Sequence, residues 1–232
     1  MKFSQIKEPS VEKPLIIAAL QDMGNVGNLV IDFINRVKKS SVFRIAESSQ
    51  PSYVLDRGGY IEIPKEEWEY RYAENMIVFG GGIGQPKTND DLHALCQDVI
   101  DVALKHSSKF IYTFGGFHTM HPVGTDPKAF ITTTSEELTN QVEKLGVHIT
   151  PSKSVITGFN GLILGYAKMN GLQGIGIYGE LNEPAIPQYR TAKSVIKTLE
   201  RLTYKGFGDT KEFDILAEDM ERKLKSGWRY DP

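Results

Sequence analysis

Two glycine-rich turns carry residue types that could bind a phosphate. The segment Asp22-Met23-Gly24-Asn25-Val26-Gly27 has the spacing of a dinucleotide-binding turn, with Asp22 in the place of its first glycine. A carboxylate there would face the incoming pyrophosphate. Residues Gly81 to Thr88 have the spacing of a phosphate-binding loop, with Pro86 in place of the second glycine. Because proline has no N–H to donate, we interpret both segments as tight turns rather than working phosphate sites.

Histidine and carboxylate side chains suggest two further kinds of chemistry. His118 and His121 have H-x-x-H spacing with Asp126 nearby, a set that could bind a metal ion, but no fourth ligand accompanies them. Glu180 and Glu183 follow a predicted strand and could share acid and base roles, but no nucleophile or matching base is evident. We therefore expect no catalytic residue, no metal site and no cofactor.

The elements that position these turns follow from the hydrophobic pattern. Short apolar runs predict buried strands, and apolar residues three and four apart predict helices. A capping box at Thr134 and Glu137 predicts the start of one helix, and Gly227 suits the end of the last. The predicted strands cover residues 15–20, 42–46, 76–79, 110–114, 129–133 and 175–178, and the predicted helices cover residues 26–37, 88–103, 134–145, 160–169, 188–204 and 210–226.

The alternation of strands and helices predicts an α/β fold with an open, mostly parallel sheet covered by helices on both faces. Residues 53–72 differ, because Gly58-Gly59 separates two short apolar runs and predicts a hairpin. We interpret that region as a small antiparallel excursion from the main sheet. Gly206-Phe207-Gly208 is the one hinge-like segment, so we expect a core domain over residues 1–206 and a C-terminal helix and tail over residues 207–232.

The composition excludes several classes of protein. A formal net charge of -2 over 232 residues gives no reason to expect nucleic acid as a partner. A single cysteine excludes an internal disulfide framework. No apolar run reaches the roughly 18 residues of a membrane span, and residues 1–13 do not resemble a signal peptide. We expect a cytoplasmic protein with no membrane partner.

In open α/β sheets, ligands bind in the crevice beyond the carboxyl ends of the strands. The predicted turns bring a set of small and polar residues to that edge. We expect this crevice to bind a ligand or a protein partner through Gly24, Asn25, Gly27, Gly82, Gly84, Gly116, Asn160 and Glu180.

The order of these turns along residues 14–204 resembles the proteasome-assembly-chaperone family, meaning the second eukaryotic chaperone and its archaeal and bacterial relatives. The resemblance is carried by Gly24-Asn25-Val26-Gly27, Gly80-Gly81, Gly115-Gly116, Ile156-Thr157-Gly158-Phe159-Asn160-Gly161, Gly179-Glu180 and Ala192. It implies a three-layer α/β/α sandwich similar to purine nucleoside phosphorylases, usually without enzymatic activity. The eukaryotic member works in a heterodimer that helps to assemble the proteasome α-ring, and prokaryotic members are often homo-oligomers.

The carboxyl end of the chain departs from one feature of that family. Some archaeal relatives end in a hydrophobic residue, a tyrosine and any residue, a tail that docks between proteasome α-subunits. This chain ends Trp228-Arg229-Tyr230-Asp231-Pro232, with the tyrosine third from the end rather than second.

Two interpretations remain open. In the first, the chain is a non-enzymatic, chaperone-like protein that self-associates and binds proteasome α-subunits or another family member. In the second, it is an enzyme or sensor that binds a nucleotide or carboxylate in the glycine-rich crevice. The second predicts that one pocket is lined by Gly82, Gly84, Gly116, Asn160 and Glu180.

Overall fold

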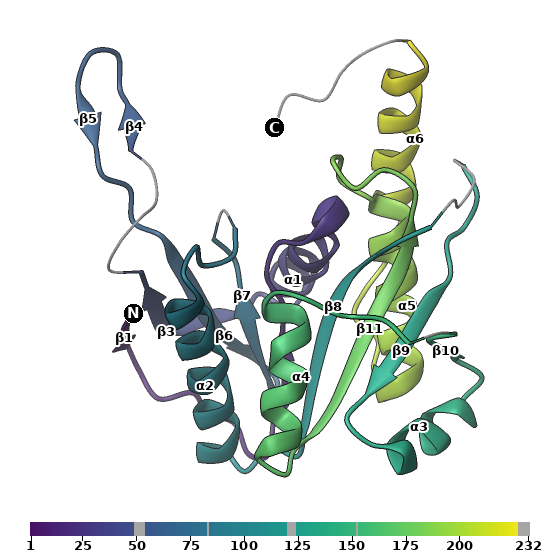
Figure 1. The fold of residues 1–232 in the computed structure, drawn as a ribbon, viewed down its shortest axis with the longest axis horizontal. Helices are drawn as coiled ribbons and strands as arrows, with labels where there is room; N and C mark the ends of the chain where they lie inside the picture. The colour runs from purple at the N-terminus through teal and green to yellow at the C-terminus, as the bar shows by residue number, and fades with distance from the viewer. Residues whose placement is uncertain (49–53, 83, 120–123, 152, 227–232) are drawn as a thin grey trace.

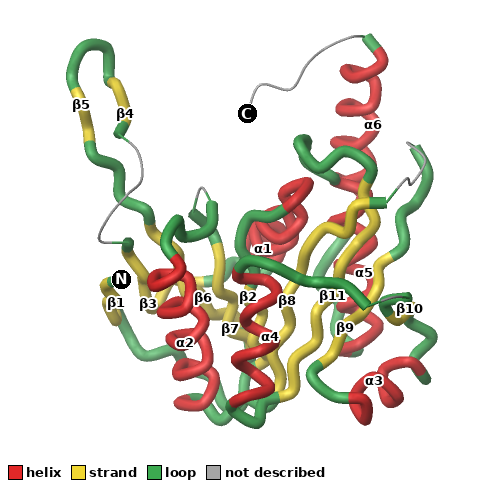
Figure 2. The backbone as a smooth tube through the Cα atoms, in the orientation of Figure 1, coloured by secondary structure: helices red, strands yellow, loops and turns green. Residues whose placement is uncertain are grey.

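The computed structural model describes residues 1–48, 54–82, 84–119, 124–151 and 153–226. Within these residues, nine strands form one sheet in the order β1-β3-β6-β7-β2-β8-β11-β9-β10. Figures 1 and 2 show this sheet running across the molecule between two sets of helices. The strands are β1 (Lys2–Gln5), β2 (Leu15–Ala18), β3 (Ser41–Glu47), β6 (Glu67–Ala73), β7 (Met76–Gly80), β8 (Phe110–His118), β9 (Ala129–Thr133), β10 (His148–Ile149) and β11 (Gln173–Leu181).

The sheet is mixed, so the prediction of a mostly parallel sheet is corrected. The central strands β7, β2, β8 and β11 are parallel, but β1, β3, β6 and β7 pair antiparallel, as do β11 and β9. One cause is the tight turn between β6 and β7, where Glu74 adopts a left-handed conformation with φ of 49°. This turn folds β7 back along β6, because antiparallel strands can be joined by a very short connection.

The predicted excursion at residues 53–72 divides between two sheets. Its last part is β6, which belongs to the main sheet, whereas β4 (Leu55–Asp56) and β5 (Ile61–Glu62) form a separate two-stranded hairpin. Gly58 and Gly59 turn this hairpin at positive φ, and the Asp56 side chain accepts hydrogen bonds from both of their N–H groups. Figure 1 shows the hairpin projecting away from the rest of the molecule.

Helices cover both faces of the sheet, which confirms the three-layer sandwich. On one face α1 packs against α5, and α5 against α6; on the other face α2 packs against α4. A short α3 lies beside β9 and β10. The helices are α1 (Val26–Val37), α2 (Asn89–Lys105), α3 (Glu136–Glu143), α4 (Phe159–Met169), α5 (Tyr189–Thr203) and α6 (Lys211–Lys225).

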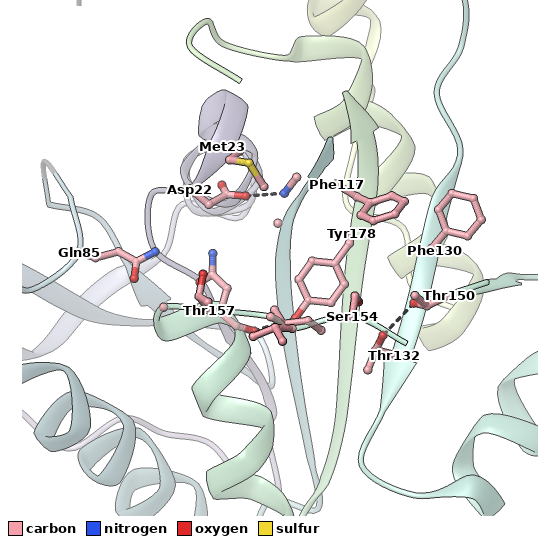
Figure 3. A pocket seen from close by; sticks show the side chains of 16 residues that line it. Asp22, Met23, Gln85, Phe117, Phe130, Thr132, Thr150, Ser154, Thr157 and Tyr178 are labelled. Carbon is pink, nitrogen blue, oxygen red and sulfur yellow. Dashed lines mark hydrogen bonds between the residues drawn. The ribbon is translucent and has the colours of Figure 1, made fainter. Parts of the chain in front are cut away.

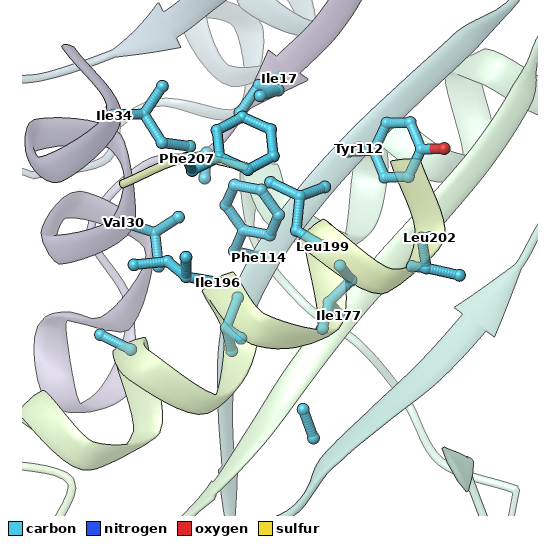
Figure 4. Close-up of a cluster of buried hydrophobic side chains, with 14 of the residues drawn as sticks. Ile17, Val30, Ile34, Tyr112, Phe114, Ile177, Ile196, Leu199, Leu202 and Phe207 are labelled. Atoms are coloured by element: carbon cyan, nitrogen blue, oxygen red, sulfur yellow. The ribbon is translucent and has the colours of Figure 1, made fainter. Parts of the chain in front are cut away.

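Each face of the sheet buries its own apolar core. Beneath α1 and α5, Phe114 of β8 packs with Leu199 and with Phe207, which is fully buried (Figure 4). Phe213 of α6 belongs to the same core and contacts Phe33 of α1, with ring centroids 5.2 Å apart and the ring planes tilted by 46°. The opposite core lies under α2 and α4 and includes Trp68, Tyr70, Phe79 and Phe159. The division at residues 206 and 207 stays a prediction, with α6 packed against α1 and α5.

Most predicted elements are present, but the end of one strand and the cap of one helix differ from the prediction. The strand predicted to end before Gly115 continues as β8 to His118, so Gly115 and Gly116 lie within a strand rather than in a turn. The N-cap of α3 is Ser135, whose hydroxyl accepts from the Leu138 N–H, and not Thr134. The Thr134 hydroxyl instead accepts from the Gly174 N–H of β11. Gly227 lies outside the described residues.

Among the described helices, none is both long enough and apolar enough to cross a membrane.

Candidate functional site: a cavity at the carboxyl ends of the central strands

A cavity of about 360 Å³ lies at the carboxyl ends of the central strands. Its walls come from the turn after β2, from β8, β9 and β11, and from the segment that leads into α4 (Figure 3). Asp22 and Phe130 lie on opposite sides of Tyr178 in this view. The described lining residues are Asp22, Met23, Gln85, Gly115, Gly116, Phe117, Phe130, Thr132, Thr150, Ser154, Val155, Ile156, Thr157, Gly158, Asn160 and Tyr178. We call this space the Asp22 cavity.

The Asp22 carboxylate joins the start of α1 to strand β8. Its Oδ1 accepts a hydrogen bond from the Gly27 N–H at 2.8 Å, and its Oδ2 accepts one from the Gly116 N–H. Burial raises the pKa of Asp22 to about 7, although these hydrogen bonds act in the opposite direction. Backbone N–H groups at a helix N-terminus are the usual ligands of a phosphate. Here the Asp22 side chain already accepts from one such N–H group, that of Gly27.

Close packing around the carboxylate explains the glycines beside it. A Cβ atom at Gly27 would overlap the carbonyl oxygen of Leu20, and one at Gly116 would overlap the side chain of Leu181. Both glycines therefore let neighbouring segments approach closely, which is a structural requirement independent of any ligand.

Asn160 joins the start of α4 to the end of β2. Its Oδ1 accepts from the Leu20 N–H at 2.8 Å, and its Nδ2 donates to the Leu20 carbonyl at 2.9 Å. The Tyr178 hydroxyl donates to the Asn160 carbonyl at 2.8 Å. The side chain of Asn160 is buried, so these bonds satisfy polar groups that water does not reach.

Gln85 is a cavity residue that sequence reasoning missed. Its Oε1 accepts from the Phe159 N–H at 2.9 Å and thereby caps α4, while its Nε2 donates to the Gln21 carbonyl at 2.8 Å. No local pattern signals this role, because Gln85 and Phe159 lie far apart in the sequence. The N-termini of α1 and α4 thus both have side-chain acceptors, Asp22 and Gln85.

The remaining predicted glycines lie in the turns around the cavity. The Gly24 N–H donates to the Pro184 carbonyl, and Asn25 is the N-cap of α1, in a left-handed conformation with φ of 54°. After β7, a Cβ at Gly82 would meet the Trp68 indole, and the Gly84 carbonyl accepts from the Trp68 Nε1. None of these four is among the described residues that line the Asp22 cavity.

Glu180 lies in a second, more open cavity of about 610 Å³ between the ends of β8 and β11, the start of α5, and α6. Its carboxylate accepts from the Lys128 N–H at 2.9 Å, and its carbonyl accepts from the Thr191 hydroxyl. Glu183 lines the same cavity. The structure therefore brings Gly116 and Asn160 together in one cavity and places Glu180 in another.

The metal hypothesis concerns His118, His121 and Asp126. His121 lies outside the described residues. In the part of the chain that the structure describes, no three His, Cys, Asp or Glu side chains are grouped so that they could hold a metal ion.

Comparison with known proteins gives matches over nearly the whole chain. Residues 16–226 match the PAC2 family. The uncharacterized protein MJ1210 of Methanocaldococcus jannaschii is 25% identical over 218 residues, which are 93% of this chain and 80% of that protein.

Solved structures share the fold. Pyrococcus furiosus PbaB, described as an archaeal proteasome activator, has a TM-score of 0.82 at 22% identity over 97% of both chains. Pyrococcus furiosus PbaA, described as an archaeal homolog of proteasome-assembly chaperone, has a TM-score of 0.79 at 21% identity over 97% of this chain and 90% of that one. Mycobacterium tuberculosis Rv2125, described as a proteasome-assembly chaperone homologue, has a TM-score of 0.70 at 12% identity over 94% of this chain and 97% of that one.

Proposed function

This chain belongs to the PAC2 family, and on that premise we propose that it is a non-enzymatic, chaperone-like protein that self-associates and binds proteasome α-subunits. The observation that carries the proposal is the similarity of fold to PbaB and PbaA over nearly the full length of each chain. Both of those proteins are described by their relation to the proteasome.

The chemistry of the Asp22 cavity supports a scaffold role for the glycine turns. Asp22 and Gln85 cap the two helices whose N-termini lie at this edge. Gly27 and Gly116 are required by close packing. These residues therefore have structural tasks that need no substrate.

The β4–β5 hairpin, residues 54–63, supports self-association. Val54, Tyr60, Ile61 and Ile63 are each more than half exposed on it, from 54% to 70%. A two-stranded hairpin is marginally stable by itself in water, and large exposed apolar side chains favour burial against a partner. We propose that the hairpin packs against a second copy of this chain.

Purification of a tagged chain from its native host tests the proposal. We expect proteasome α-subunits, identified by mass spectrometry, to co-purify with the wild-type chain and to be depleted when untagged chain is added as a competitor. Preparations that contain the chain but no α-subunits above the background of an untagged host would contradict it.

A further inference from the structure

The Asp22 cavity contains one acidic side chain and, among its described lining residues, no lysine, arginine or histidine. An anionic ligand would therefore meet a carboxylate without a basic side chain to balance it. The backbone N–H groups of Gly27 and Gly116 already donate to Asp22, so they are not free to bind an anionic ligand. This charge pattern disfavours the nucleotide or carboxylate that the glycine-rich turns suggested.

The rest of the lining mixes apolar and aromatic side chains with uncharged polar ones, namely the amides of Gln85 and Asn160 and the hydroxyls of Thr132, Thr150, Ser154 and Thr157. Phe117 and Phe130 meet edge to face with ring centroids 5.9 Å apart, and Tyr178 lies between them and Asp22 in Figure 3. The hydroxyls of Thr132 and Thr150 hydrogen-bond to each other at 2.8 Å. Aromatic faces close to a carboxylate attract cations, because the negative ring faces add to the charge of the acid.

The volume of the Asp22 cavity and its opening to solvent suit the binding of a small ligand. A cavity of about 360 Å³ lies in the range of small-molecule sites. Asp22 is largely buried within the protein, but it borders the cavity. The segment 154–158 lines another side of the cavity, and Val155 of this segment is 88% exposed to solvent. A ligand can therefore approach the carboxylate without unfolding an element of the sandwich.

We propose that the Asp22 cavity binds a small organic cation, a protonated amine on an apolar body, with the ammonium group toward Asp22 and the body against Phe117, Phe130 and Tyr178. This binding activity goes beyond the proposed function and does not depend on it. Each carboxylate oxygen that accepts one backbone N–H retains a further lone pair for the ammonium. The raised pKa of Asp22 fits an acid whose carboxylate lacks a cationic partner.

Three probes with one apolar body test the charge preference: phenylpropylamine, phenylpropanol and phenylpropanoate. Binding is followed by NMR through the backbone amides of Gly115, Gly116 and Thr150, which line the cavity. A charge-assisted hydrogen bond is worth about 1.5–3 kcal/mol, so we expect the amine to bind at least about tenfold more tightly than the carboxylate. The alcohol is expected to fall between them.

A surface substitution links the preference to this cavity without touching the core. Val155→Arg places a cation at the opening. We expect it to lower the affinity for the amine and to reduce the ratio of the affinities for the amine and the carboxylate. Met169→Arg, at an 82% exposed position at the end of α4, is the matched control and should change neither. The proposal is overturned if the alcohol or carboxylate binds as tightly as the amine, if the amine leaves these amides unmoved, or if both arginine variants act alike.

Discussion

Asp22 and Asn160 show how single side chains hold the carboxyl edge of the sheet together. Each satisfies two polar backbone partners that belong to other segments, Asp22 those of Gly27 and Gly116, and Asn160 both groups of Leu20. Leaving such buried groups without partners is costly. Stability measurements on variants of these two residues therefore test this account of the edge.

Replacing Asn160 by alanine is expected to lower the free energy of unfolding by about 2 kcal/mol, because the N–H and carbonyl of Leu20 lose their partners in a buried place. Urea denaturation measures this change. Asn170→Ala is the matched control, since the Asn170 side chain also donates to a backbone carbonyl, that of Tyr166 at 2.9 Å, but does so at an exposed position. It should change stability by less than about 1 kcal/mol, because water can replace an exposed hydrogen bond. Equal effects of the two variants would contradict the role given to Asn160.

The raised pKa of Asp22 predicts a particular dependence of stability on pH. Its pKa is about 7 in the folded chain and 3.8 ordinarily, so between these values the folded state binds more protons than the unfolded state. Stability contributed by Asp22 therefore falls as pH rises through this interval and is constant above it.

The comparison with Asp22→Asn isolates this contribution. Tyr178 is the other titratable side chain among the described lining residues, and its pKa is raised far above this interval by burial and by Asp22. The unfolding free energy of the wild type minus that of the variant should decrease with pH inside the interval. A difference that stays flat would show that Asp22 titrates normally.

At the scale of elements, the start of α1 depends on a glycine and the middle of α4 does not. A Cβ at Gly27 would overlap the Leu20 carbonyl, whereas one at Gly165 would meet no other atom within 4 Å. Gly27→Ala should therefore destabilise the chain by about 2 kcal/mol or more. Gly165→Ala should stabilise it by about 0.5–1 kcal/mol, because alanine favours the helix. Thermal and urea denaturation of both variants measure the contrast. A Gly27→Ala variant that is as stable as the wild type, or a Gly165→Ala variant that is less stable than the wild type, would contradict it.

The sequence predicted elements that carry a strong periodic pattern and failed where pairing depends on distant segments. The apolar stripe of residues 26–37 has the same bounds as α1, and residues 129–133 have those of β9. The antiparallel part of the sheet was predicted only as an excursion over residues 53–72, which includes most of β6. Strand β1 and the β6–β7 pairing were missed, because β1 is a short polar segment and the turn at Glu74 contains no glycine or proline. Both features depend on tertiary context rather than local preference.

The candidate site was predicted less completely than the fold. Gly116 and Asn160 do line one cavity. Both could be predicted because glycine and asparagine near the ends of predicted strands and helices stand out in the sequence. Gln85 was missed because its partners, Phe159 and Gln21, are distant in sequence. Glu180 was predicted to line the same crevice as Gly116 and Asn160, because the predicted strand ended before it. Strand β11 instead continues through Glu180, which lines the second cavity beside α6.

At the scale of the whole molecule, the exposed hairpin provides a test of self-association. Changing both Ile61 and Ile63 to aspartate removes apolar surface from residues that are 69% and 70% exposed, so the fold should be retained. We expect self-association, measured by sedimentation equilibrium, to weaken at least about tenfold.

Met169→Asp is the control for that experiment, because Met169 is an isolated exposed apolar residue at the end of α4. It should self-associate like the wild type. The proposal that the hairpin packs against a second copy would be contradicted if the wild-type chain is monomeric at every concentration tested, or if the hairpin variant self-associates as strongly as the wild type.

The central claim, that this member of the PAC2 family acts by binding proteasome α-subunits, is tested most directly with purified components. Native mass spectrometry of the chain mixed with α-subunits from its own host reports the masses of the species formed. We expect a species that contains both proteins and that disappears when an unrelated α/β protein replaces this chain. Spectra that contain only the separate proteins, at concentrations where the α-subunits themselves are soluble and folded, would contradict it.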